Sequence, residues 1–203
     1  MKPSVSVLGG GSWGSTLAHL IAREDRPVYL WVRRQEQADE IRQHRTNKRY
    51  LQDRQLSPFI YPTLSMEEAA QAPIIVVSVP AKSFREQTRT LGNFVKPDQI
   101  LLSATKGIEP KTHLLMSQVL KQETACLKVG AISGPNLALE VIDNHPTATL
   151  VASRFDEVVE QGMQILNSKS FRAYGSHDIL GVELAGALKN VMAIAAGIIH
   201  GIG

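Results

Sequence analysis

Residues 4–23, SVSVLGGGSWGSTLAHLIAR, decide the fold of this chain. Residues 4–8 are a short run rich in β-branched residues that leads directly into glycines, which predicts a strand followed by a tight turn. From Trp13 onward, apolar residues recur at helical spacing, which predicts a helix over 13–23. A strand, a glycine turn and a helix in this order form the first half of a βαβ unit.

The same alternation continues along the chain. Further strands are expected at 28–32, 74–79, 99–104, 128–132, 147–152 and 171–174, and helices at 35–45, 67–71, 83–91, 113–121 and 156–166. Residues 47–62 are expected to form a loop. The run IIVVSV at 74–79 is apolar throughout, as in a strand buried on both faces. The pattern predicts an α/β fold with a Rossmann-like, doubly wound, mostly parallel sheet.

Composition excludes several protein classes. The 203 residues are 43% hydrophobic and 20% charged, which argues against disorder and against a coiled coil. The one cysteine, Cys126, excludes an internal disulfide and fits a reducing compartment. The N-terminus lacks the apolar core of a signal peptide, and no cluster of His, Cys and Asp suggests a metal. We therefore expect a cytoplasmic protein that needs no metal.

The glycine run contains G-x-G-x-x-G as Gly9, Gly11 and Gly14. In this motif the first glycine allows the tight turn, the second lets a pyrophosphate approach, and the third lets the helix pack on the strand. Gly10-x-Ser12-x-Gly14 also matches the nucleophile elbow of hydrolases, but too few residues precede it to supply an oxyanion loop. A plain glycine-rich turn is the other alternative. The position between strand and helix favours a dinucleotide site.

Basic residues gather just after this unit. Residues 33–54 hold seven basic and four acidic residues, a local excess of +3 that equals the net charge of the whole chain. A solvated helix face and a phosphate site both explain it, and a net charge of +3 does not indicate nucleic acid. Arg33 and Arg34 stand at the end of the second strand, where an NAD site usually has an acid. They favour NADP through its 2′-phosphate, and nearby Glu36 leaves NAD possible.

Three further features lie at the expected carboxyl edge of the sheet or beyond it. Lys106 follows a strand and precedes a glycine, and Gly134-Pro135-Asn136 follows another strand. Residues 178–199 predict a long helix that is apolar on most faces, with Lys189 and Asn190 inside it. By itself, a lysine there is either snorkelling or functional. The apolar stretch 184–199 is judged too short and too polar to span a bilayer.

These pieces together resemble the bacterial type of the NAD(P)-dependent glycerol-3-phosphate dehydrogenase family. The motifs that carry the resemblance are VLGGGSWGSTLA, LWVRR, NKRYL, VVSVPAKSFRE, SATKGIEP, SGPNLALEV, HPTA and GVELAGALKNVMAIAAGIIHGIG. They span the chain in the order and spacing of the family. The resemblance implies interconversion of dihydroxyacetone phosphate and sn-glycerol 3-phosphate by hydride transfer with NAD(P)H. It also implies a supply of glycerol 3-phosphate for phospholipid synthesis.

The resemblance assigns roles to individual residues. It makes Lys189 the catalytic general acid and base. Contacts to a small-molecule substrate are expected from Lys106, Gly134, Asn136, Lys189 and Asn190. Contacts to the cofactor are expected from Gly9, Gly11, Ser12, Trp13, Gly14, Arg33, Arg34, Lys106 and Ala138. One departure from the family is Leu139, which stands where a lysine is usual.

The family also implies a domain organisation. Residues 1–177 are expected to form the dinucleotide-binding domain, and 178–203 the connecting helix of a truncated C-terminal substrate domain. The fragment is expected to bind cofactor without turnover, and the full-length protein to be a homo-oligomer without a membrane span. Two alternatives stay open. They are a related dehydrogenase of the 6-phosphogluconate or β-hydroxyacid type, and a non-catalytic dinucleotide-binding module.

Overall fold

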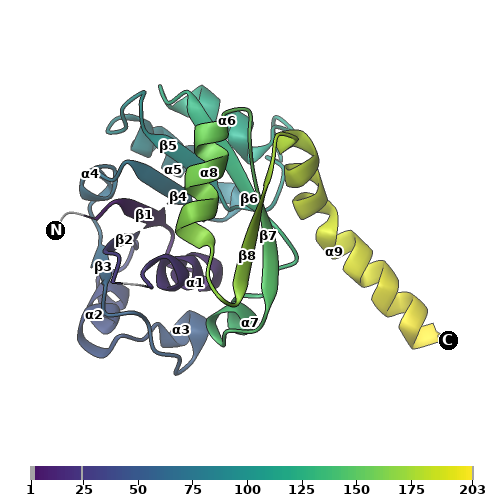
Figure 1. Cartoon of the computed structure of the whole chain (residues 1–203), viewed down its shortest axis with the longest axis horizontal. Helices are drawn as coiled ribbons and strands as arrows, with labels where there is room; N and C mark the ends of the chain where they lie inside the picture. Colours follow the sequence, from purple (N-terminus) through teal and green to yellow (C-terminus); the bar gives the residue numbers. More distant parts are fainter. Residues whose placement is uncertain (1–2, 24, 203) are drawn as a thin grey trace.

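The computed structural model describes residues 3–23 and 25–202. In this part of the chain, eight strands form one sheet in the order β3-β2-β1-β4-β5-β6-β7-β8 (Figure 1). Their bounds are β1 (Val5–Leu8), β2 (Val28–Trp31), β3 (Ile60–Thr63), β4 (Ile74–Val77), β5 (Ile100–Ser103), β6 (Lys128–Ser133), β7 (Thr147–Ser153) and β8 (Phe171–Ser176). Neighbouring strands are parallel except β6 and β7, which are antiparallel. The predicted doubly wound, mostly parallel α/β fold is confirmed.

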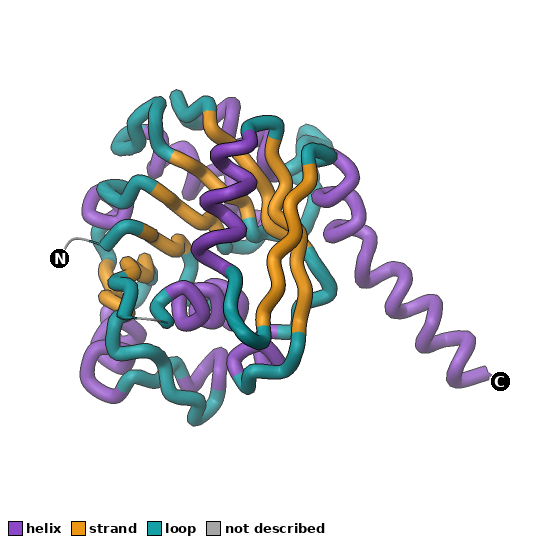
Figure 2. The backbone as a smooth tube through the Cα atoms, viewed as in Figure 1, coloured by secondary structure: helices purple, strands orange, loops and turns teal. Residues whose placement is uncertain are grey.

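Helices cover both faces of the sheet (Figure 2). Their bounds are α1 (Ser12–Ile21), α2 (Gln35–His44), α3 (Lys48–Leu51), α4 (Met66–Ala69), α5 (Ala81–Gly92), α6 (Met116–Glu123), α7 (Ala138–Ile142), α8 (Asp156–Leu166) and α9 (Ile179–Ile202). Side chains alternate along β4, so Ile74 and Val76 join the core beneath α1, α2 and α8. Ile75 and Val77 join the core beneath α4, α5 and α6. The sheet is thus buried on both sides.

Two predictions about short segments are wrong. Residues 47–62, expected as a loop, contain α3 and β3. β3 pairs only with β2, so its Pro62 lies on an edge strand, where a missing backbone N–H is tolerated. The five-residue helix α7 was also not expected. α3 and α7 are little more than one helical turn each, and β3 contains Pro62, which disfavours a strand prediction.

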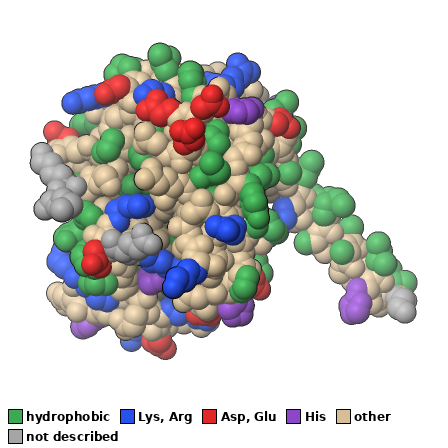
Figure 3. Space-filling model, viewed as in Figure 1, with side chains coloured by type: hydrophobic (Ala, Val, Ile, Leu, Met, Phe, Trp, Pro, Cys, Tyr) green, Lys and Arg blue, Asp and Glu red, His purple; other side chains and the backbone are tan. Residues whose placement is uncertain are grey.

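The last helix, α9, leaves the body of the molecule (Figure 1). Only Val182 and Glu183 are buried along it, and apolar side chains lie exposed along its surface (Figure 3). α9 is longer than the predicted apolar stretch 184–199, and by length and composition alone it could cross a membrane. A single such helix is weak evidence of a span, since core helices of soluble proteins pass the same test. Its exposed apolar residues require a covering surface.

An ion-pair network ties the segment between β5 and α6 to α5. Arg85 binds Glu109 through two hydrogen bonds, both 2.7 Å long, and also pairs with Glu123. Thr112 donates a further hydrogen bond to Glu109. These hydrogen bonds lower the pKa of Glu109 from 4.5 to about 2, and the bonds from Arg85 have the largest effect. The carboxylate therefore holds the segment that contains Lys106.

We predict that Glu109→Gln destabilises the fold in a pH-dependent way. A lowered pKa means that the carboxylate stabilises the fold above pH 4.5 and loses this contribution as pH falls toward 2. The difference in unfolding free energy between parent and variant should therefore shrink over that window. Urea unfolding at a series of pH values measures it, with Glu86→Gln on the exposed side of α5 as control. A difference that stays constant with pH would contradict the prediction.

Candidate cofactor site

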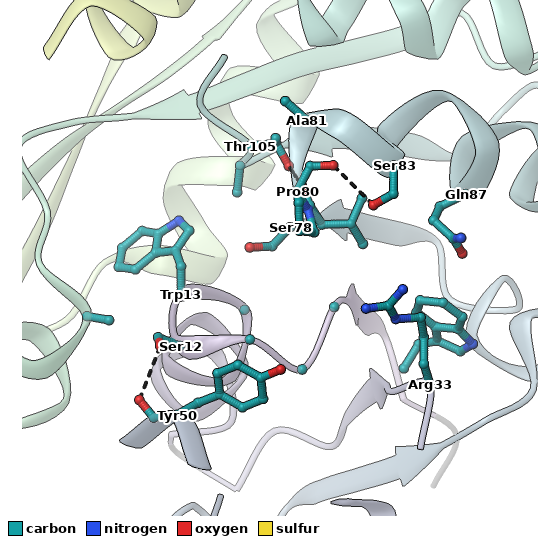
Figure 4. A pocket seen from close by; sticks show the side chains of 18 of the residues that line it. Ser12, Trp13, Arg33, Tyr50, Ser78, Pro80, Ala81, Ser83, Gln87 and Thr105 are labelled. Atoms are coloured by element: carbon teal, nitrogen blue, oxygen red, sulfur yellow. Dashed lines mark hydrogen bonds between the residues drawn. The ribbon is translucent and has the colours of Figure 1, made fainter. Parts of the chain in front are cut away.

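A cavity of about 760 Å³ lies at the carboxyl edge of the sheet, where β1 and β4 diverge into helices on opposite faces. Open α/β sheets bind ligands at this switch point. Every residue predicted to contact the cofactor lines this cavity, and so do two predicted substrate residues, Lys106 and Asn136. Gly134, Lys189 and Asn190 do not line it. Figure 4 shows the cavity with Trp13 toward one end and Arg33 toward the other.

The glycine loop has the geometry that the motif requires. Gly9 has a φ of +117°, and a Cβ there would lie 2.2 Å from the carbonyl oxygen of Ser78. A Cβ on Gly14 would lie 1.9 Å from the carbonyl oxygen of Gly9, so α1 packs directly on the turn. A Cβ on Gly11 would meet nothing within 4 Å. The surface at Gly11 is therefore open to a ligand, beside the free N–H groups that begin α1.

One end of the cavity is cationic. Arg33 is exposed and Arg34 is half-buried, and both line the cavity. The guanidinium groups of Arg34 and Arg49 lie 6.0 and 5.8 Å from the centre of the Tyr50 ring. The three arginines that line the cavity, two of them beside this ring, suit the 2′-phosphate of NADP. Glu36, the acid that could serve NAD, is exposed and is not among the cavity's lining residues.

Arg49 and Tyr50 are site residues that were not predicted from the sequence. Both line the cavity from α3, and the hydroxyl of Ser12 donates to the backbone oxygen of Tyr50 at 3.1 Å (Figure 4). The motif NKRYL was the signal that could have found them. The bond from Ser12 also argues against a hydrolase, because its hydroxyl is directed to a carbonyl and no histidine is among the cavity's lining residues.

Lys106 lies at the other end of the cavity. Gly107 follows it with a φ of +145°, which turns the chain against the start of α5. The Lys106 ammonium donates to the backbone oxygen of Gly134 at 2.7 Å. Burial, and then the nearby charge of Lys189, lower the pKa of Lys106. The structure thus brings two predicted substrate residues, Gly134 and Lys189, close to Lys106.

Asn136 presents an unsatisfied acceptor near the cavity. The residue is buried, and its side-chain amide donates to the backbone oxygen of Ala148 at 2.8 Å. Its side-chain oxygen has no hydrogen-bond partner among the described residues. A buried acceptor without a partner suits a ligand that brings a donor, such as a hydroxyl group. Leu139, the departure from the family pattern, is exposed and is not a lining residue.

The first turns of α9 are held against the sheet. A Cβ on Gly186 would lie 2.3 Å from the hydroxyl oxygen of Ser133 and 3.6 Å from Cγ of Lys106, so the helix passes very close to the end of β6. One turn further on, Lys189 is half-buried and Asn190 is exposed. The close approach at Gly186 therefore sets the position of Lys189 beside Lys106.

Glu183 fixes the same part of α9, and the sequence analysis missed it. Its buried carboxylate accepts hydrogen bonds from the backbone N–H of Ser117, at 2.9 Å, and from the Ser117 hydroxyl. Ser117 is in the first turn of α6, where backbone N–H groups lack helical partners. Burial raises the pKa of Glu183. The residue thus ties α9 to α6.

Comparisons with known proteins agree with this geometry. The family model for the N-terminus of NAD-dependent glycerol-3-phosphate dehydrogenase matches residues 4–159, and that for the C-terminus matches 178–203, which includes α9. The chain is 41% identical over 200 residues to the NAD(P)+ glycerol-3-phosphate dehydrogenase of Teredinibacter turnerae, covering 98% of this chain and 59% of that protein. It is 40% identical to that of Halothermothrix orenii, covering 100% and 60%.

A solved structure is similar as well. The crystal structure of glycerol-3-phosphate dehydrogenase from Coxiella burnetii matches with a TM-score of 0.89 and 31% identity, over 97% of this chain and 61% of that one. The chain thus spans about 60% of the length of these relatives. Because the N-terminal family model matches most of its residues, the chain belongs to the NAD-dependent glycerol-3-phosphate dehydrogenase family.

Proposed function

We propose that this chain forms the cofactor-binding part of a cytoplasmic dehydrogenase that interconverts dihydroxyacetone phosphate and sn-glycerol 3-phosphate with NADPH. The observation that carries the proposal is the arrangement around one cavity of an open glycine loop, an arginine cluster and Lys106. The names of the relatives support the reaction. A role in supplying glycerol 3-phosphate for phospholipids, and assembly into a homo-oligomer, follow from the family as predictions.

The residues present fit a dinucleotide. The N–H groups at Gly11 and at the start of α1 suit its pyrophosphate, and Arg33 and Arg34 suit the 2′-phosphate. Trp13, Lys106 and Ala138 also line the cavity and are available to the nicotinamide. When bound, the cofactor supplies a hydride for the carbonyl carbon of the substrate.

The chain's own residues provide the proton and the charges. Lys189 donates a proton to the substrate oxygen in reduction and accepts it in the reverse direction. Lys106 attracts the anionic substrate, and its bond to the oxygen of Gly134 holds its ammonium in place. The free side-chain oxygen of Asn136 accepts from a substrate hydroxyl. These groups lie on three segments that meet at the end of β6.

The first prediction concerns cofactor choice. This chain should bind NADPH about tenfold to a hundredfold more tightly than NADH, because a charge-assisted bond to the 2′-phosphate has no counterpart in NADH. Arg33→Asp should narrow or reverse the difference. Fluorescence titration of both nucleotides measures this difference in affinity. Arg42→Asp is the control, because Arg42 lies on α2, shortly after Arg33, and does not line the cavity. Equal affinities in the parent chain would refute the assignment.

The second prediction separates two glycines. Gly11→Val should keep the fold and abolish NADPH binding, because a Cβ there meets no protein atom within 4 Å and the side chain would fill the pyrophosphate position. Gly14→Ala should disrupt the fold, because its Cβ would lie 1.9 Å from the Gly9 oxygen. Thermal unfolding followed by circular dichroism, together with NADPH titration, measures both effects. Near-parental binding by Gly11→Val would show that the loop does not hold the cofactor.

The third prediction tests Lys189. In the protein extended to the length of its relatives, Lys189→Ala should lower kcat about 10²–10⁴-fold, the usual contribution of general acid-base catalysis, with NADPH affinity unchanged. Oxidation of NADPH with dihydroxyacetone phosphate is the assay, and Lys96→Ala at an exposed position is the control. The 203-residue chain should bind NADPH without turnover. An unimpaired Lys189→Ala enzyme would return this lysine to a structural role.

A further inference from the structure

Gly10 lies in the glycine run but at a position where the G-x-G-x-x-G motif does not require a glycine. A Cβ there would lie 2.5 Å from Cγ1 of Val32 and 2.7 Å from Nε2 of Gln37. Its backbone oxygen accepts two hydrogen bonds, from Nε2 of Gln37 at 2.5 Å and from Nδ2 of Asn47 at 3.0 Å. Gly10 is therefore pressed against two side-chain amides behind the loop.

The two amides form one buried cluster. Asn47 is fully buried and Gln37 is 8% exposed. Nδ2 of Asn47 also donates to the hydroxyl of Ser15 on α1 at 2.8 Å, and its Oδ1 accepts from Nε2 of Gln37 at 3.3 Å. The cluster thus joins α1, α2 and the residue that precedes α3 to a single carbonyl of the glycine loop.

The geometry of the peptide unit gives this contact a consequence. The carbonyl of Gly10 and the N–H of Gly11 belong to one peptide unit, and the described chain contains no cis peptide bonds. In a trans peptide these groups point in opposite directions. Holding the carbonyl on the amides therefore directs the N–H of Gly11 away from them, toward the cavity that Gly11 lines.

The glycines make such a clamp necessary. A peptide flanked by glycines can rotate at little cost, because glycine occupies positive and negative φ about equally well. Gly9, Gly10 and Gly11 form three glycines in a row, so the loop's own backbone does not fix the orientation of this N–H. The surrounding side chains have to supply that orientation.

We propose that Gln37 and Asn47 are positioning residues, which orient the peptide between Gly10 and Gly11 so that its N–H faces the cofactor's pyrophosphate. This inference rests on the proposed binding of NADPH. Both residues act through the loop. Their amide nitrogens are already committed to the Gly10 oxygen, to the Ser15 hydroxyl and to Oδ1 of Asn47. Gln37 also lines the cavity.

The test uses Gln37→Met, which keeps the side-chain length and removes the donor. NADPH should bind this variant about threefold to tenfold more weakly. This is the loss of affinity expected when one hydrogen bond that orients the peptide is removed. Gln99→Met is the matched control. Gln99 is 7% exposed, and its amide nitrogen likewise donates two hydrogen bonds, here to the backbone oxygens of Ala70 and Ala72, which do not line the cavity. Gln99→Met should bind NADPH with the parent's affinity, while its loss of folding stability should be similar to that of Gln37→Met.

A second ligand distinguishes loss of the peptide's orientation from a general loss of the folded site. Adenosine 2′-phosphate carries the adenine and the 2′-phosphate but no pyrophosphate, so Gln37→Met should bind it as the parent does. Should Gln37→Met fail to fold, Asn47→Ala removes the other donor and gives the same comparison. If Gln37→Met bound NADPH at parental affinity, or lost affinity for both ligands equally, the positioning role alone would be overturned. A parent chain that does not bind NADPH would overturn the proposed function with it.

Discussion

The structure depends on the contact between the Gly9 carbonyl and Gly14, which leaves no room for a Cβ. It sets the first turn of α1 directly on the end of β1, and this places free helical N–H groups at the edge of the sheet. The cavity exists because the neighbouring strand β4 sends its helix to the opposite face. Binding chemistry at this edge thus follows from a steric constraint between two backbone segments.

The two ends of the cavity are built differently. At the arginine end, positive charge collects on short segments after β2, and the guanidinium groups of Arg34 and Arg49 both lie near the Tyr50 ring. At the lysine end, Lys106 and Lys189 belong to separate elements held by backbone contacts and by the bond between Glu183 and Ser117. Lys189 lies where the packed part of α9 gives way to its exposed part. Its surroundings therefore depend on whatever covers the exposed part of α9.

Much of the fold was predictable from local pattern. The strand 4–8, the glycine turn and the helix after it appear in the structure within a few residues of their predicted bounds, as does the helix 156–166. β3 was missed because it contains Pro62 and is held in place by pairing with β2, and α3 was missed because it is a single turn with only two apolar residues. The apolar composition of α9 was evident, but its full length was underestimated.

The sequence by itself determined the order of elements, the glycine loop and the arginine pair, because each is encoded by residues close together in the chain. Only the tertiary structure decided which groups support them. Gln37 and the Gly10 oxygen are 27 residues apart in sequence, and Glu183 and Ser117 are 66 apart. Contacts over such separations leave no period or spacing in a single sequence. They arise from the winding of the chain around the sheet, which brings buried donors and acceptors together because burial without a partner is costly.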